Sequence, residues 1–193
     1  MSRRFHVAGN RWLDHPPPVL SPAQKDWLTR GGSLTRHLQA FGRVKVVVLN
    51  ESVVGADGDE HGCLGVAPRH PLWSRDVMLT VEGSPMVVAH SVTRLAHSRS
   101  VWQAMRRLHT RPLADLLYHD TTVTRSILVC RALGRRHMLH RLAWQSGAQA
   151  PLPPRLWARR SVFQRHGAAL LVSEAFLPRF WDMLDSPQWL AAR

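Results

Sequence analysis

The stretch ALLVSEAFLP, residues 169–178, decides how we expect this chain to fold. Its alternating pattern predicts a β-strand, in which successive side chains point to opposite faces. Glu174 would therefore share a face with Leu170 and Val172, and Phe176 continues that face. A carboxylate stands where the pattern calls for a hydrophobic residue, so the apolar side of the predicted sheet carries a charge.

A second predicted strand, WSRDVMLTV at residues 73–81, repeats this anomaly with the opposite charge. Arg75 shares a face with Trp73 and Val77. A buried arginine and a buried glutamate need partners, because an unpaired charge is costly to remove from water. Two interpretations stay open. The charges pair with each other and with polar neighbours as structural contacts, or they face a cavity in which an anionic small molecule completes the bonding.

Composition predicts one globular domain with a sizeable core, since 193 residues are 45% hydrophobic and 20% charged. No run approaches the roughly 20 apolar residues of a membrane span, and the N-terminus lacks the apolar core of a signal peptide. We therefore expect a soluble, cytoplasmic protein. The two cysteines, Cys63 and Cys130, lack C-x-x-C spacing and are expected to be free thiols.

The formal net charge of +13 raises the hypothesis of nucleic-acid binding. The arginines are spread along the chain, however, without a block of five or more and without zinc-finger spacing. A positive surface also attracts small dianions. We expect a small-molecule substrate and no nucleic acid; a steep dependence of affinity on salt would be the signature of the alternative.

Histidine is frequent, with twelve in the chain, which raises the hypothesis of a metal site. The strongest pattern is His137-x-x-His140, with His61 and Cys63 elsewhere. It has neither the H-E-x-x-H helix nor the supporting carboxylates of a metal centre, so we expect no metal.

Periodicity, caps and turns predict a single α+β domain, with a mainly antiparallel six-stranded sheet, helices covering one face and an enclosed ligand site. Residues 1–20, which contain three consecutive prolines, are predicted to form a flexible tail, and the domain is expected to span residues 21–193. Two helices are predicted to begin at the caps Ser21 and Ser33.

The other expected elements follow in chain order. A strand is predicted over residues 44–54, a loop over 56–65, a hairpin over about 73–93, a helix pair over 101–117, a strand over 121–132, an irregular insertion or flap over 134–154, a hairpin over 157–177 that turns at 166–167, and a final segment over 180–184 that folds back.

Seven segments, taken in order, carry a family resemblance. They are DWL at 26–28, GSLT at 32–35, LWSRDV at 72–77, TRPL at 110–113, TVTR at 122–125, LWARRS at 156–161 and LVSEAFLP at 171–178. Together they resemble the chorismate pyruvate-lyase family, whose members convert chorismate to 4-hydroxybenzoate and pyruvate in the first committed step of ubiquinone biosynthesis. The resemblance implies a lyase, and we expect it to be a monomer. Each segment is short, but the ordered set is specific.

The resemblance also assigns ligand contacts. Arg75 matches the arginine that holds the ring carboxylate, and Glu174 matches the acid at the hydroxyl end. Leu113 matches a residue that helps to cradle the ligand. At Leu34 the family often has methionine, a change that conserves volume and should preserve an apolar wall.

The reaction itself agrees with two charged residues and no cofactor. Loss of the C4 hydrogen and cleavage of the C3 ether make the ring aromatic, so no metal or redox group is needed. Arg75 suits two-pronged recognition of a carboxylate. Glu174 can bond the 4-hydroxyl and act as the general base or position it. We therefore predict that both residues are catalytic.

Other charged residues favour a structural interpretation. We expect Arg125, Arg159 and Arg160 to form salt bridges around the sheet, and His90 to be a satisfied core or rim histidine. A function of a different class also stays open: a non-catalytic module that senses an aromatic acid, as in the effector domains of transcription regulators with a similar fold.

Overall fold

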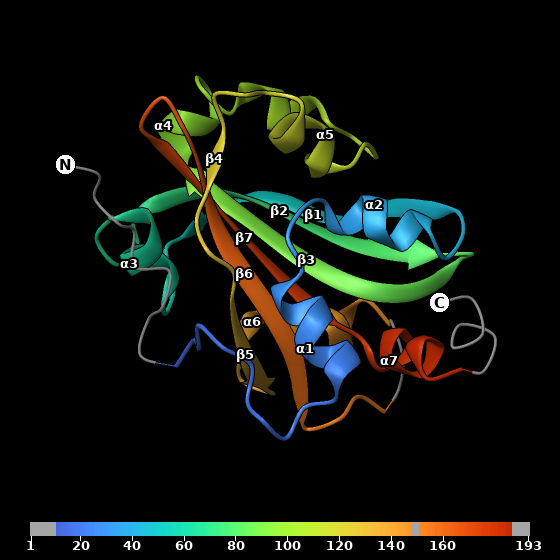
Figure 1. The fold of residues 1–193 in the computed structure, drawn as a ribbon. Coiled ribbons are helices and arrows are strands. Elements are labelled where there is room, and N and C mark those ends of the chain that lie inside the picture. The colour runs from blue at the N-terminus through green and yellow to red at the C-terminus, as the bar shows by residue number, and fades with distance from the viewer. Residues whose placement is uncertain (1–10, 148–150, 187–193) are drawn as a thin grey trace.

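The computed structural model describes residues 11–147 and 151–186 and contains a seven-stranded antiparallel sheet (Figure 1). The strands lie in the order β1-β2-β3-β7-β6-β4, and β5 also pairs with β6. They are β1 (Val44–Gly55), β2 (Pro71–Val81), β3 (Ser84–Arg94), β4 (Thr124–Arg125), β5 (Val129–Gly134), β6 (Arg155–Arg165) and β7 (Ala168–Phe176). The predicted α+β class with a mainly antiparallel sheet is confirmed.

Helices connect and cover the strands. They are α1 (Pro22–Thr29), α2 (Leu34–Gln39), α3 (Glu60–Leu64), α4 (Leu95–Ser98), the 3-10 helix η1 (Gln103–Arg107), α5 (Leu113–Tyr118), α6 (Met138–Gln145) and α7 (Pro178–Leu184). The final segment folds back as predicted, because Phe180 of α7 is fully buried against Trp27 and Phe176.

The first two helices begin where the sequence predicts. Ser21 accepts a hydrogen bond from the Gln24 amide while the Gln24 side chain accepts one from the Ser21 amide, which is a complete capping box. Ser33 accepts from the Arg36 amide at the start of α2. Both helices are thereby fixed at their amino ends.

Two tight hairpins bring the four central strands together. Glu82 and Gly83 join β2 to β3 with φ of 47° and 78°, and His166 and Gly167 join β6 to β7 with φ of 47° and 75°. Positive φ at both positions is the geometry of a two-residue hairpin turn that matches strand twist. The predicted hairpins are confirmed.

Strand register sorts neighbouring residues onto two faces of the sheet. Arg75 lies opposite Ser91, and Ser91 lies opposite Val172, on what we call the front face. The next residues along, Asp76 and His90, lie opposite each other on the back face. Helices α1 and α2 contact the front of the sheet, and α3 and α6 contact β7 and β3 from behind.

The predicted single strand over residues 121–132 is instead two strands. The chain bends at Ser126, whose amide donates to the Val162 carbonyl, and β5 starts again at Val129. Ile127 lies in the break and is 65% exposed. This break raises the strand number from six to seven.

The back face has its own helical cover, which the sequence did not predict. Residues 134–154 were expected to be irregular, but they contain α6, capped by the His137 side chain, which accepts from the Leu139 amide. Leu139 and Ala143 are fully buried, one turn apart, against the sheet. The glycine and prolines around this short apolar stripe obscured it. The loop predicted at 56–65 likewise contains α3.

The flexible-tail prediction is wrong for residues 11–20. Trp12 is 4% exposed within the core, and Leu13 forms a backbone bridge with Cys130 of β5. Apolar burial at Trp12 outweighs the extended bias of the three prolines that follow. Residues 1–10 lie outside the described residues.

A charged histidine lies at the centre of the back face. His90 is buried, and its two ring nitrogens contact Asp76 and Glu60. Burial opposes protonation of the imidazole, but the hydrogen bonds and charges of the two carboxylates outweigh it and raise the pKa of His90 to about 9. His90 is therefore a structural cation at neutral pH.

We predict that His90 makes the stability pH-dependent on the alkaline side. Its pKa is raised from 6.5 to about 9 on folding, so its contribution to the free energy of unfolding is full below pH 6.5 and is lost as the pH rises through 9. The stability difference between wild type and His90→Gln should shrink by about 3 kcal/mol over that range. Denaturant titrations at several pH values measure it, and a constant difference would contradict the assignment.

Candidate functional site

A small cavity lies between the front face and the helices that cover it, with a volume of about 60 Å³. The structure brings all four sequence-predicted contacts, Arg75, Glu174, Leu34 and Leu113, to its wall. The other lining residues are Gly32, Thr35, Val46, Val77, Leu79, Ala89, Ser91, Pro112, Ala114, Leu117, Tyr118, Arg125, Phe163 and Val172. The wall is mostly apolar, with a few charged groups directed at the space.

Arg75 is 2% exposed and anchored on three sides. Its Nη1 donates to Glu51 Oε1 at 3.0 Å, and its Nη2 donates to the carbonyl oxygens of His109 at 2.7 Å and Arg111 at 3.3 Å. Burial lowers the pKa of the Arg75 guanidinium, and the charge of Glu51, directly opposite on β1, acts against that shift. These bonds use three of the five guanidinium donors, which leaves donors for a ligand.

Glu174 has a different arginine as its partner. It lies opposite Arg159 of β6, and its Oε2 accepts from Arg159 Nε at 2.7 Å. Arg159 is fully buried and also donates to the carbonyl oxygens of Trp27 at 2.9 Å and Arg30 at 3.0 Å. Arg75 and Glu174 therefore do not pair with each other. Each forms a structural ion pair with another residue, and both also face the same cavity.

Arg125 differs from the other two arginines. Its Nε donates to Ser161 Oγ at 2.8 Å, and its Nη1 donates to the Tyr118 hydroxyl at 2.9 Å and to the Gly32 carbonyl at 3.2 Å. Burial lowers the pKa of the Arg125 guanidinium, the nearby Arg159 charge lowers it further, and the charge of Glu174 acts against that shift. No carboxylate of the described residues forms a salt bridge with it, so the predicted salt bridge is wrong here, whereas Arg159 and Arg160 do form ion pairs.

Tyr118 closes the cavity and was missed from the sequence. Its hydroxyl, which accepts from Arg125, donates to the Gly32 carbonyl at 2.6 Å and so joins the end of α5 to the turn before α2. Burial raises the pKa of Tyr118, which keeps the hydroxyl protonated. An apolar helix ending in a tyrosine gave no sequence signal for this contact, because its partner lies 86 residues away.

The histidines predicted not to bind metal have other contacts. His137 caps α6, and His140 Nε2 contacts the Pro153 carbonyl oxygen at 2.9 Å. Within residues 11–147 and 151–186, no cluster of three or more His, Cys, Asp or Glu side chains is arranged to hold a metal ion. Cys63 and Cys130 are buried and form no disulfide. In the same ranges, no helix combines the length and hydrophobicity that a membrane span requires.

The profile of the chorismate lyase family matches residues 12–185. The chain belongs to the chorismate lyase family. The resemblance seen in the short sequence segments is confirmed, and it covers nearly all of the described residues.

Relatives with the family name align with this chain over most of their length. The probable chorismate pyruvate-lyase of Bordetella avium is 49% identical over 175 residues, which cover 88% of this chain and 84% of the relative. That of Bordetella pertussis is 46% identical over 176 residues, covering 91% and 93%. That of an Azoarcus species is 37% identical over 184 residues, covering 94% and 97%.

Solved structures share the fold of this chorismate lyase family member at low sequence identity. PhnF from Mycobacterium smegmatis superimposes with a TM-score of 0.54 and 17% identity, covering 77% of this chain and 65% of that one. The C-terminal domain of the histidine utilization repressor from Pseudomonas syringae gives 0.53 and 9%, covering 71% and 93%. At these identities the likeness concerns the fold alone.

We predict that the Tyr118 hydroxyl limits opening of the cavity. Tyr118→Phe removes two hydrogen bonds, the one donated to Gly32 and the one accepted from Arg125, each worth about 1 kcal/mol, so amides of residues 32–38 and 113–118 should exchange with solvent at least about fivefold faster. Thr29→Val is the matched control, since that hydroxyl bonds only within α1. Unchanged exchange in Tyr118→Phe would show that the cover is held by other contacts.

Proposed function

We propose that this protein converts chorismate to 4-hydroxybenzoate and pyruvate, the first committed step of ubiquinone biosynthesis. One observation carries the proposal: in a member of the chorismate lyase family, Arg75 and Glu174 line the same mostly apolar cavity. We further propose that it acts in the cytoplasm as a monomer, on a small molecule and without nucleic acid. The sensor alternative is not favoured, because the curated relatives have lyase names.

The geometry suits a flat ring held at both ends. Arg75 and Glu174 come from strands two positions apart in the sheet, and neighbouring strands are separated by about 4.8 Å. Glu174 also lies two residues along β7 from Val172, which is level with Arg75 through Ser91, so the two backbones are roughly 12 Å apart. In this arrangement Arg75 holds the ring carboxylate and Glu174 bonds the 4-hydroxyl. Leu34 and Leu113 supply apolar walls.

Arg125 is the cation that can bind the second carboxylate of chorismate. Chorismate carries two carboxylates and 4-hydroxybenzoate only one. Glu51 offsets Arg75 and Glu174 offsets Arg159, which leaves Arg125 as the cavity cation without a carboxylate partner among the described residues. Arg125 therefore holds the enolpyruvyl carboxylate. It stabilises negative charge on the departing group and has no carboxylate to hold in the aromatic product.

The chemical step needs only this chain and its substrate. As the C4 proton leaves, the electrons of that C–H bond complete the aromatic ring and the C3–O bond breaks. Enolpyruvate departs with the bonding pair and takes up one proton to become pyruvate, so protons balance overall. Glu174 accepts the C4 proton or positions its acceptor, and the nearby Arg159 guanidinium keeps the carboxylate oriented toward the ring.

An activity assay tests the proposal. Purified protein mixed with chorismate and no additive should form 4-hydroxybenzoate and pyruvate in equal amounts, followed by ultraviolet absorbance and product identification. Chorismate that stays intact in the presence of folded protein would refute the proposed reaction and support a sensing function.

We predict that Glu174→Gln separates chemistry from packing. Glutamine keeps the shape and the contact to Arg159 but cannot accept a proton at neutral pH, so single-turnover rates should fall roughly 10²–10⁴-fold while 4-hydroxybenzoate still binds. Glu82→Gln, in the exposed turn between β2 and β3, is the control. If the variant reacts at nearly the wild-type rate, Glu174 has only a structural function.

We predict that Arg75 and Arg125 differ in which ligand they recognise. Arg75→Gln should weaken binding of both chorismate and 4-hydroxybenzoate by more than about tenfold, since a charge-assisted carboxylate contact is worth roughly 1.5–3 kcal/mol. Arg125→Gln should weaken chorismate binding to a similar extent but leave 4-hydroxybenzoate affinity within about twofold. Calorimetry with 4-hydroxybenzoate and KM for chorismate measure the two. Equal losses of both ligands in Arg125→Gln would contradict the assignment.

A further inference from the structure

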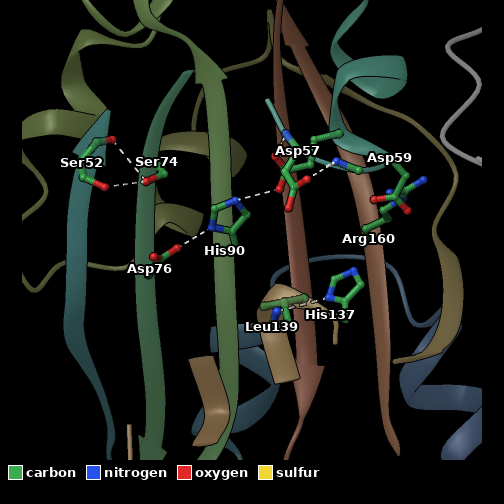
Figure 2. A network of polar contacts seen from close by, with 11 residues as sticks. Ser52, Asp57, Asp59, Ser74, Asp76, His90, His137, Leu139 and Arg160 are labelled. Atoms are coloured by element: carbon green, nitrogen blue, oxygen red, sulfur yellow. Dashed lines mark hydrogen bonds and ion pairs between the residues drawn. The ribbon is translucent and has the colours of Figure 1, made fainter. Parts of the chain in front are cut away.

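A second and larger cavity lies on the back face of the sheet, with a volume of about 580 Å³. Its floor contains His90, Ser173 and Arg160, which lie opposite one another across β3, β7 and β6. Figure 2 shows His90 and Arg160 on this side of the sheet. Each is next in sequence to a front-face residue, so this back cavity lies directly behind the candidate active site. Its volume lies in the range of ligand pockets, roughly 300–1,000 Å³.

The floor is buried and positively charged. Arg160 is 1% exposed; its Nη1 donates to Asp59 at 2.9 Å, and its guanidinium lies 4.2 Å from the centre of the Trp12 ring. Asp59 also faces Arg131 at 3.5 Å, so one carboxylate serves two arginines. His90 adds a charge that its own two carboxylates offset.

The rim carries further positive charge without acidic partners. Arg135 and Arg136, in the turn before α6, and Arg11 line the cavity and are exposed. None of these three forms a salt bridge with an acidic residue in the part of the chain that the structure describes. The nearby Asp57 accepts from the Gly58 amide instead. The back cavity as a whole therefore has more positive than negative charge.

The start of α6 adds a polar contribution from the backbone. Met138 and Leu139, the first two residues of this eight-residue helix, line the cavity. The amino end of a helix carries partial positive charge, and here the Leu139 amide already donates to His137 Nδ1. His137, at the cap, is uncharged at neutral pH because burial lowers its pKa to about 4.

We propose that the back cavity binds a small phosphate-bearing anion. Guanidinium groups match phosphate oxygens in a two-pronged geometry, and a helix amino end favours the same group. Several cations converge on one space, which favours a multiply charged anion over a singly charged carboxylate. The floor residues are almost fully buried, so a compact ligand reaches them whereas a polymer backbone on the surface does not.

The test uses pyrophosphate as the probe, titrated into the full chain by calorimetry. We expect one site per chain, and we expect Arg135→Ala/Arg136→Ala to weaken the affinity by at least about tenfold, because two guanidinium contacts are removed. Both residues are exposed, so the variant should fold. The control Arg99→Ala/Arg107→Ala removes the same charge at two exposed positions outside the cavity lining.

Equal losses in both double variants would overturn the inference, and so would no binding at about 10 mM pyrophosphate. Tighter binding of citrate than of pyrophosphate would also overturn it, because it would indicate a carboxylate site. Arg75→Gln alters only the front cavity. It therefore tests in which cavity pyrophosphate binds, whether or not the proposed reaction is correct. Pyrophosphate affinity that is unchanged in Arg75→Gln supports a back-face site, and a tenfold loss there would place the anion in the front cavity.

Discussion

Two buried arginines, Arg75 paired with Glu51 and Arg159 paired with Glu174, hold the front cavity and its cover together. Taking a guanidinium out of water costs several kcal/mol, and the cost is offset only when further hydrogen bonds satisfy its remaining donors. Here those further bonds go to backbone carbonyls of the covering segments. Arg75 reaches the turn before α5, and Arg159 reaches the end of α1. The same pairs thus support the sheet, position the cover and direct charge at the cavity.

Side-chain parity on long strands was sufficient to locate the central charges. Glu174 and Arg75 stand among hydrophobic residues on strands of nine and eleven residues, so their inward orientation followed from alternation alone. Their partners could not be found in this way. Glu51 lies on β1 beyond a register shift between Val48 and Asn50, and the alternation of β1 does not fix which residue faces Arg75.

Short and broken elements account for the rest of what the sequence left out. Arg125 lies on a two-residue strand, which is too short for alternation to fix the orientation of the residues after it, and Ile127 is exposed. Tyr118 acts through a contact with Gly32, whose distance in sequence carries no local signal. Helix α6 has only eight residues, and its burial depends on the back face that it covers. Such features are decided by tertiary packing.

The most direct measurement of the central claim is a crystal structure of the protein with 4-hydroxybenzoate. The account predicts the ligand in the front cavity, with its carboxylate on Arg75, its hydroxyl on Glu174 and its ring between Leu34 and Leu113. A ligand with its carboxylate at Glu174, or one bound only in the back cavity, would contradict it.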